Sequence, residues 1–205
     1  MADLSYPSLD TAPSRLRLQT IARLRWIAVA GQIFTLLVTY FGAAFDLPLL
    51  ACLGVVAMSV VVNLFLQLRY PSRHRLSVPF ATALLTYDVL QLGLLLYLTG
   101  GLENPFAFLL VAPVTVSAAT MPTESTLAIS VATLAVSALL VRYHEPLPWH
   151  PGVTFELPVL YRLGMWCSIL CSTLFLSLYA RRLAREARQM SAALAATELV
   201  LSREQ

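Results

Sequence analysis

The 205-residue sequence contains no lysine and few charged residues of any kind. Charged side chains make up 12% of the chain, whereas a soluble domain carries about 25%. Hydrophobic residues reach 58%, and the mean hydropathy is +0.73. This number of charged residues is too small to cover a water-facing surface. The composition therefore excludes an ordinary soluble globular protein. It predicts a protein of the lipid bilayer, and no nucleic-acid partner is expected.

Cysteine and histidine are also scarce. The three cysteines lie inside apolar runs: Cys52, Cys167 and Cys171. Cys167 and Cys171 lie four residues apart, on one face of a helix. Buried cysteine usually behaves as a small hydrophobic residue, so this pair is interpreted as a helix contact rather than a redox pair. The three histidines lie in loops: His74, His144 and His150. Haem in a membrane bundle needs histidines within the spans, and the loop histidines are irregularly spaced, so neither haem nor a metal site is expected.

Apolar runs of membrane-spanning length fill most of the chain. Hydropathy gives six, of which the fourth and fifth are short: residues 26–45, 47–68, 78–99, 106–120, 125–141 and 159–180. Pro113 interrupts the fourth run and is expected to free a carbonyl one turn earlier. The predicted fold class is all-α, a polytopic membrane bundle of six transmembrane helices with a cytoplasmic C-terminal helical stalk. The predicted layout is an N-terminal segment, a six-span domain and the stalk, over 1–24, 25–180 and 181–205.

The distribution of arginine predicts the orientation of the bundle. Twelve of the fourteen arginines fall on one side of the six spans, and two fall on the other. The twelve lie in residues 15–25, 69–75 and 181–203, and the two are Arg142 and Arg162. Basic residues concentrate in cytoplasmic loops, so both termini are expected in the cytoplasm. The loops after the third and fifth spans then face outward.

Beyond residue 180 the chain changes character. Residues 181–205 are rich in arginine, alanine and glutamate, which favour a helix. Apolar or small residues recur there at intervals of three and four: Ala187, Met190, Leu194, Thr197 and Leu201. This seam is typical of either a surface amphipathic helix or a dimeric coiled coil that carries a signal out of the membrane. No helix stop signal precedes Gln205, so a further cytoplasmic domain is expected.

Polar residues inside the spans are few. Asp88 is the one acid well inside a span; Gln91 follows one turn along, and Asn63 and Gln32 lie on neighbouring spans. An ionisable residue at membrane depth marks a functional site by default. Two interpretations remain open: a proton-accepting site, or interhelical hydrogen bonding with Asp88 protonated. Asp88 lies about 18 Å along its helix from Gly100, so the two are not expected to touch the same ligand head.

The most informative motif lies between the third and fourth spans, where residues 100–106 read GGLENPF. The string suits a tight turn: a glycine ends one helix in the left-handed conformation, Asn104 caps the next, and Pro105 takes its first position. The same residues suit a ligand site. A helix start offers unpaired N–H groups, Asn104 adds an amide if capping leaves it free, and Phe106 and Tyr97 offer rings.

This motif resembles the GG-x-x-NPF loop of the RegB/PrrB family of redox-responsive sensor histidine kinases. The match is complete at the five fixed positions, Gly100, Gly101, Asn104, Pro105 and Phe106. The six-span layout, the arginine-rich cytoplasmic faces and the helical exit are also similar. The resemblance implies that these five residues sense the ubiquinone pool. Glu103 and Tyr97 join the candidate site because they lie beside it.

The resemblance further implies a homodimer in the bacterial cytoplasmic membrane. Such a kinase autophosphorylates a cytoplasmic histidine and passes the phosphate to a cognate response regulator. These 205 residues carry no nucleotide-binding motif, and the one His-Glu pair, His144-Glu145, is followed by prolines on the outer side. No phosphoacceptor histidine is therefore expected in the chain, which is predicted to be the sensor input of a longer protein.

Other hypotheses stay open on the residues alone. One is a small transporter or channel with a polar path through Asp88, Gln91, Asn63 and Gln32. Another is a plain membrane anchor for a cytoplasmic domain. For a sensor, the signal could also come from a respiratory oxidase through protein contacts. An arginine-rich helical stalk is unusual for a transporter, which favours the sensor.

Overall fold

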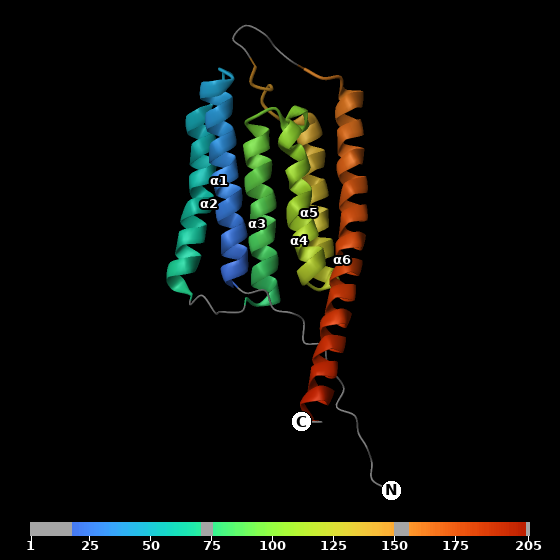
Figure 1. Cartoon of the computed structure of the whole chain (residues 1–205). Coiled ribbons are helices and arrows are strands. Elements are labelled where there is room, and N and C mark those ends of the chain that lie inside the picture. Colours follow the sequence, from blue (N-terminus) through green and yellow to red (C-terminus); the bar gives the residue numbers. More distant parts are fainter. Residues whose placement is uncertain (1–17, 71–75, 150–155, 204–205) are drawn as a thin grey trace.

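The computed structural model describes residues 18–70, 76–149 and 156–203. Every regular element in these ranges is helical, and successive membrane segments run in alternating directions (Figure 1). The α-helices are α1 (Leu18–Leu37), α2 (Leu49–Arg69), α3 (Val78–Tyr97), α4 (Ala112–Thr120), α5 (Thr123–Arg142) and α6 (Val159–Arg203). The predicted all-α membrane bundle is confirmed.

Five of these segments are long and apolar enough to cross a membrane. They coincide with the first, second, third, fifth and sixth predicted spans. The first is α1 together with the π-helix η1 (Val38–Gly42), which winds directly on from it. Hydropathy therefore located the second, third and fifth spans to within about two residues. The first helix begins at Leu18, eight residues before the predicted start, and the last helix continues far beyond its apolar part.

The fourth span is a composite of a 3-10 helix, η3 (Pro105–Val111), and α4. Together they form the apolar segment Pro105–Thr120, which is shorter than the other five. A 3-10 helix rises about 2.0 Å per residue instead of 1.5 Å, so the segment reaches about 27 Å, close to the hydrocarbon thickness of about 30 Å. The winding changes beside Pro113, in the first turn of α4, where the proline has no N–H to donate.

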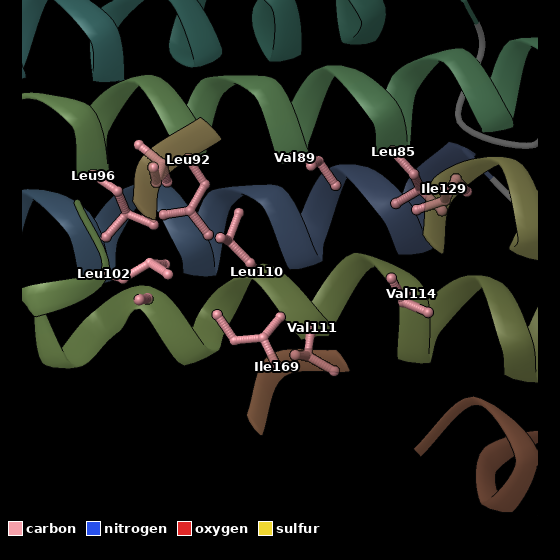
Figure 2. Packing of buried hydrophobic residues seen from close by; sticks show 12 residues of the cluster. Leu85, Val89, Leu92, Leu96, Leu102, Leu110, Val111, Val114, Ile129 and Ile169 are labelled. Carbon is pink, nitrogen blue, oxygen red and sulfur yellow. The ribbon is translucent and has the colours of Figure 1, made fainter. Parts of the chain in front are cut away.

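The main hydrophobic core lies between α3, α4, α5 and α6, with the short 3-10 helix η2 (Gly101–Glu103) at one end (Figure 2). Val89, Leu110 and Ile169 in this core are fully buried. The α1–α2 hairpin forms a second unit, in which α1 packs chiefly on α2 and α2 packs on α3. This arrangement leaves space between α1 and α3.

Helices α3 and α5 approach closely at Gly93. A Cβ atom at this position would lie 2.4 Å from Cγ1 of Val136. Thr133 and Ser137 of α5 are also fully buried. Small side chains therefore bring the two helices together, as is common between membrane helices.

The last helix, α6, runs for 45 residues, or about 67 Å, and extends well past the bundle (Figure 1). The predicted stalk is thus continuous with the sixth span. Met190 and Leu194, two residues of its predicted seam, are 64% and 66% exposed. Cys167 and Cys171 are exposed as well. The expectation that these cysteines form a helix contact is therefore wrong within a single chain.

The two ends of the bundle differ in charge. Helix α1 begins and α6 leaves the bundle at the same end, where α2 also finishes at Arg69 (Figure 1). We call this the arginine-rich end and the opposite one, with residues 98–104 and 143–149, the loop end. Several predictions fall outside the described residues: segment 1–17, Arg73, His74, Arg75, His150 and Gln205.

Candidate functional site

The glycine pair of the motif shapes the turn after α3. Gly100 has φ +101° and Gly101 has φ +58°, so both adopt the left-handed conformation predicted for a helix end. A Cβ on Gly100 would lie 2.8 Å from the Cα of Leu147, and one on Gly101 would lie 2.7 Å from His144. The glycines are thus required by backbone geometry and by the close approach of the loop-end segment 143–149.

Asn104 caps the fourth span with both ends of its amide. Its Oδ1 accepts a hydrogen bond from the Phe106 N–H at 2.9 Å. Its Nδ2 donates to the Thr99 carbonyl at 3.0 Å and to the Thr99 hydroxyl at 2.8 Å. The predicted cap is confirmed. The amide donor suggested for a ligand is already occupied.

Two further candidates, Glu103 and Tyr97, bond to residues at and just before the start of α6 and to the loop-end segment 143–149. Glu103 is buried; its Oε1 accepts from the Leu157 N–H at 3.0 Å and lies 3.7 Å from Arg162 Nη1. The Tyr97 hydroxyl lies 3.4 Å from Glu145 Oε1. These contacts fix the motif to the start of α6.

A cavity of about 680 Å³ lies between α1, α3 and the fourth span. At the loop end it is lined by Asn104, Pro105 and Phe106 and covered by residues 147–149. Leucines of α3 form much of its wall. Of the seven residues proposed from the motif region, these three border the cavity, and Gly100, Gly101, Glu103 and Tyr97 do not.

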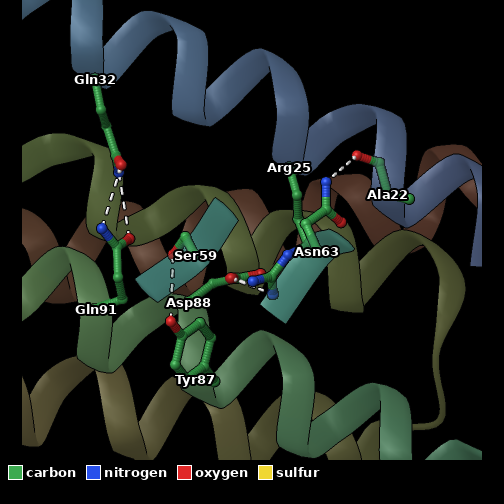
Figure 3. Close-up of polar contacts among 8 residues, drawn as sticks. All are labelled: Ala22, Arg25, Gln32, Ser59, Asn63, Tyr87, Asp88 and Gln91. Carbon is green, nitrogen blue, oxygen red and sulfur yellow. Dashed lines mark hydrogen bonds and ion pairs between the residues drawn. The ribbon is translucent and has the colours of Figure 1, made fainter. Parts of the chain in front are cut away.

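The inner part of the same cavity is polar. Asp88 and Gln91 line it, and they bond to Arg25 and Gln32 of α1 across the space between the helices (Figure 3). Arg25 Nη1 lies 2.6 Å from Asp88 Oδ1. The two glutamines exchange a reciprocal pair of hydrogen bonds at 3.2 and 3.3 Å. Asp88 and the motif are well separated, as predicted, yet one cavity joins them.

Asn63 lies apart from this cavity. Its side chain is fully buried and donates to the Ala22 carbonyl at 3.2 Å (Figure 3). Asn63 therefore holds α2 to α1. The four residues of the transporter hypothesis do not line one continuous path.

Sequence reasoning missed Arg25, which it grouped with the arginines flanking the first span. In the structure its side chain is 5% exposed, packs 5.2 Å from the centre of the Tyr87 ring and faces Asp88. The sequence did indicate such a partner, because an acid inside a membrane span usually pairs with a basic residue. Arg25 and Gln32 also lie seven residues apart, on one face of a helix.

Comparisons with known proteins agree with this architecture. Residues 10–150 match the family described as the PilS-like transmembrane domain. Over 196 residues, 96% of the chain, the sequence is 39% identical to the sensor histidine kinase RegB of Cereibacter sphaeroides, and the same figures hold for RegB of a named strain of that species. The chain spans 42% of the length of these curated relatives. No solved structure matches it.

Proposed function

Because the chain belongs to the family of PilS-like transmembrane domains, we propose that it is the membrane input domain of a sensor histidine kinase and responds to the ubiquinone pool. One observation carries the quinone proposal: the Asn104–Phe106 part of the motif borders a membrane-depth cavity whose inner part is polar. The arginine-rich end faces the cytoplasm of the bacterium in this arrangement.

The cavity suits the chemistry of a quinone. A quinone has a flat ring with two carbonyl oxygens and a long apolar tail, so it needs a few polar groups within an apolar wall. Cavities of about 300–1,000 Å³ with this character are typical of small-molecule sites. Phe106 and Leu109 both border the cavity and are 45% and 49% exposed, so they form an apolar rim. This rim gives an apolar tail a way to the lipid.

The contacts of Glu103 suggest how ligand occupancy reaches the cytoplasm. Glu103 belongs to the motif, and Arg162 opposite it lies in the first turn of α6. The α6 helix is continuous to Arg203. A quinone that favours one packing of the fourth span thereby shifts the population of α6 positions. In the proposed homodimer, paired stalks pass this shift to the kinase, which phosphorylates a cognate response regulator.

Binding of ubiquinone to the purified chain tests the proposal, with oxidised and reduced forms compared. Phe106→Ala is expected to weaken binding about tenfold, because an aromatic contact is worth about 1–2 kcal/mol. Phe108→Ala is the matched control, since Phe108 is also 45% exposed but does not border the cavity. Absence of saturable binding, or equal effects of the two substitutions, would leave an oxidase contact or a plain anchor instead.

A further inference from the structure

The inner end of the cavity holds a buried arginine with unused hydrogen-bond donors. Arg25 is 5% exposed, and its Nη1 faces Asp88. Among the described residues, its Nε and Nη2 have no hydrogen-bond partner. A guanidinium carries five N–H donors, and each buried donor without an acceptor costs about 1–3 kcal/mol. These nitrogens are fully buried although Arg25 lines the cavity, so a ligand oxygen would satisfy them once the guanidinium turns toward the cavity.

The motif residues at the loop end of the cavity offer no comparable donor. Both nitrogen-bound hydrogens of the Asn104 amide face Thr99, and the Phe106 N–H donates back to Asn104. The Ala107 N–H donates to the Asn104 carbonyl. The motif residues therefore present chiefly apolar surface to the cavity, from Pro105 and Phe106.

Arg25 is the one cation among the described residues that line the cavity. Gln32 and Gln91 are bonded to each other, and each uses its amide oxygen and one of its two amide N–H groups in this pair. The N–H group left on each is neutral, so it is a weaker donor than the charged guanidinium. Asp88 supplies an acceptor only, in contact with one guanidinium nitrogen. Ser59 lies 3.4 Å from the Tyr87 hydroxyl.

We propose that Arg25 binds the head group of the quinone: its guanidinium turns toward the cavity, its Nε–H and Nη2–H donate to a ring carbonyl oxygen at the inner end, and the tail passes Phe106 toward the lipid. This inference rests on the proposed quinone-sensing function and orients the ligand within the site. It gives Asn104 the role of holding the turn. Arg25 lies on α1 and Asp88 on α3, and their ion pair joins the two helices. A bound ligand oxygen would therefore share the Arg25 guanidinium with Asp88.

Quinone affinity of Arg25 variants tests this assignment in the full chain, with an oxidised short-tailed ubiquinone as the probe and circular dichroism as the check of folding. Arg25→Lys keeps a cation beside Asp88 but loses the planar fork of donors. The double variant Arg25→Met with Asp88→Leu leaves neither charge unpaired, so it is expected to fold. Both should weaken binding at least about tenfold. Arg23→Met, at an exposed arginine two residues away, should change it less than about twofold.

The outcomes separate the two proposals. If the wild-type chain binds quinone and a folded Arg25 variant binds equally well, the assignment of Arg25 is overturned and quinone sensing stands. If the wild-type chain binds no quinone, both fall. Infrared spectra of carbonyl-labelled quinone on the wild-type protein give an answer that needs no variant. One ring carbonyl should shift to lower frequency than in lipid, and two unshifted carbonyls would contradict the inference.

Discussion

At the scale of single residues, the turn between α3 and η3 depends on the side chain of Asn104, which bonds at both ends. Asn104→Ala removes the acceptor for the Phe106 N–H and the donors to Thr99, so the free energy of unfolding should fall by about 1–2 kcal/mol. Asn104→Asp keeps the acceptor and loses the donors, so an intermediate loss is expected. Thermal unfolding of the purified chain measures both.

The two roles considered for Asn104 give different results. If Asn104 acts as a cap, its substitution lowers the stability of the protein, and quinone affinity changes only because the turn changes shape. If Asn104→Ala unfolds like the wild type yet abolishes quinone binding, the side chain contacts the ligand and the capping role is not what matters. Thr99→Val is a useful companion, since it leaves Asn104 in place and removes the hydroxyl that accepts from Asn104 and donates to the Leu95 carbonyl.

Residue-scale predictions succeeded where the signal is local. The caps at Gly100 and Asn104 could be read from the sequence because each depends on neighbours within a few positions. The pairing of Arg25 with Asp88 could not, because it depends on how two distant helices pack. For the same reason the sequence grouped Glu103 with the ligand site, although its partners come from residues 157–162.

At the scale of helices, the contact between α3 and α5 depends on the missing side chain of Gly93. Gly93→Ala places a methyl group 2.4 Å from Val136 Cγ1, so the helices must move apart. Overpacking of this kind costs about 1–3 kcal/mol. The expected result is a lower midpoint of thermal unfolding, and adding Val136→Ala should restore much of the loss.

A matched glycine on another helix provides the control. Gly54 of α2 has no heavy atom within 4 Å of the position a Cβ would take. Gly54→Ala should therefore leave stability unchanged or raise it by up to about 1 kcal/mol, through helix propensity. Equal destabilisation by both substitutions would show that the α3–α5 contact is not the cause.

Hydropathy located the helices but could not give their winding. The six apolar runs appear as six membrane segments, because the length of an apolar run reflects bilayer thickness. A 3-10 and an α-helical segment have the same hydropathy, so the winding of Pro105–Val111 was not predictable. It depends on Pro113 and on packing against α3, α5 and α6.

At the scale of the whole molecule, the orientation of the bundle can be tested directly. In a chain whose native cysteines are replaced, Arg69→Cys marks the arginine-rich end and Tyr143→Cys marks the loop end; both positions are exposed. A membrane-impermeant maleimide on intact cells should label position 143 at least about tenfold more than position 69, because basic ends stay cytoplasmic. Lysed cells should label both, and the reverse pattern on intact cells would invert the topology.

The winding of the fourth span has a mechanical consequence. A 3-10 helix turns 120° per residue and an α-helix turns 100°. If the seven residues Pro105–Val111 rewound into the α form, the segment would shorten by about 3.5 Å and rotate α4 by about 140° relative to the motif. Because α4 packs on α6, such a change would present a different face of α4 to the helix that leaves the membrane. A change of winding over seven residues beside the cavity would thus turn α4 by more than a third of a revolution against α6.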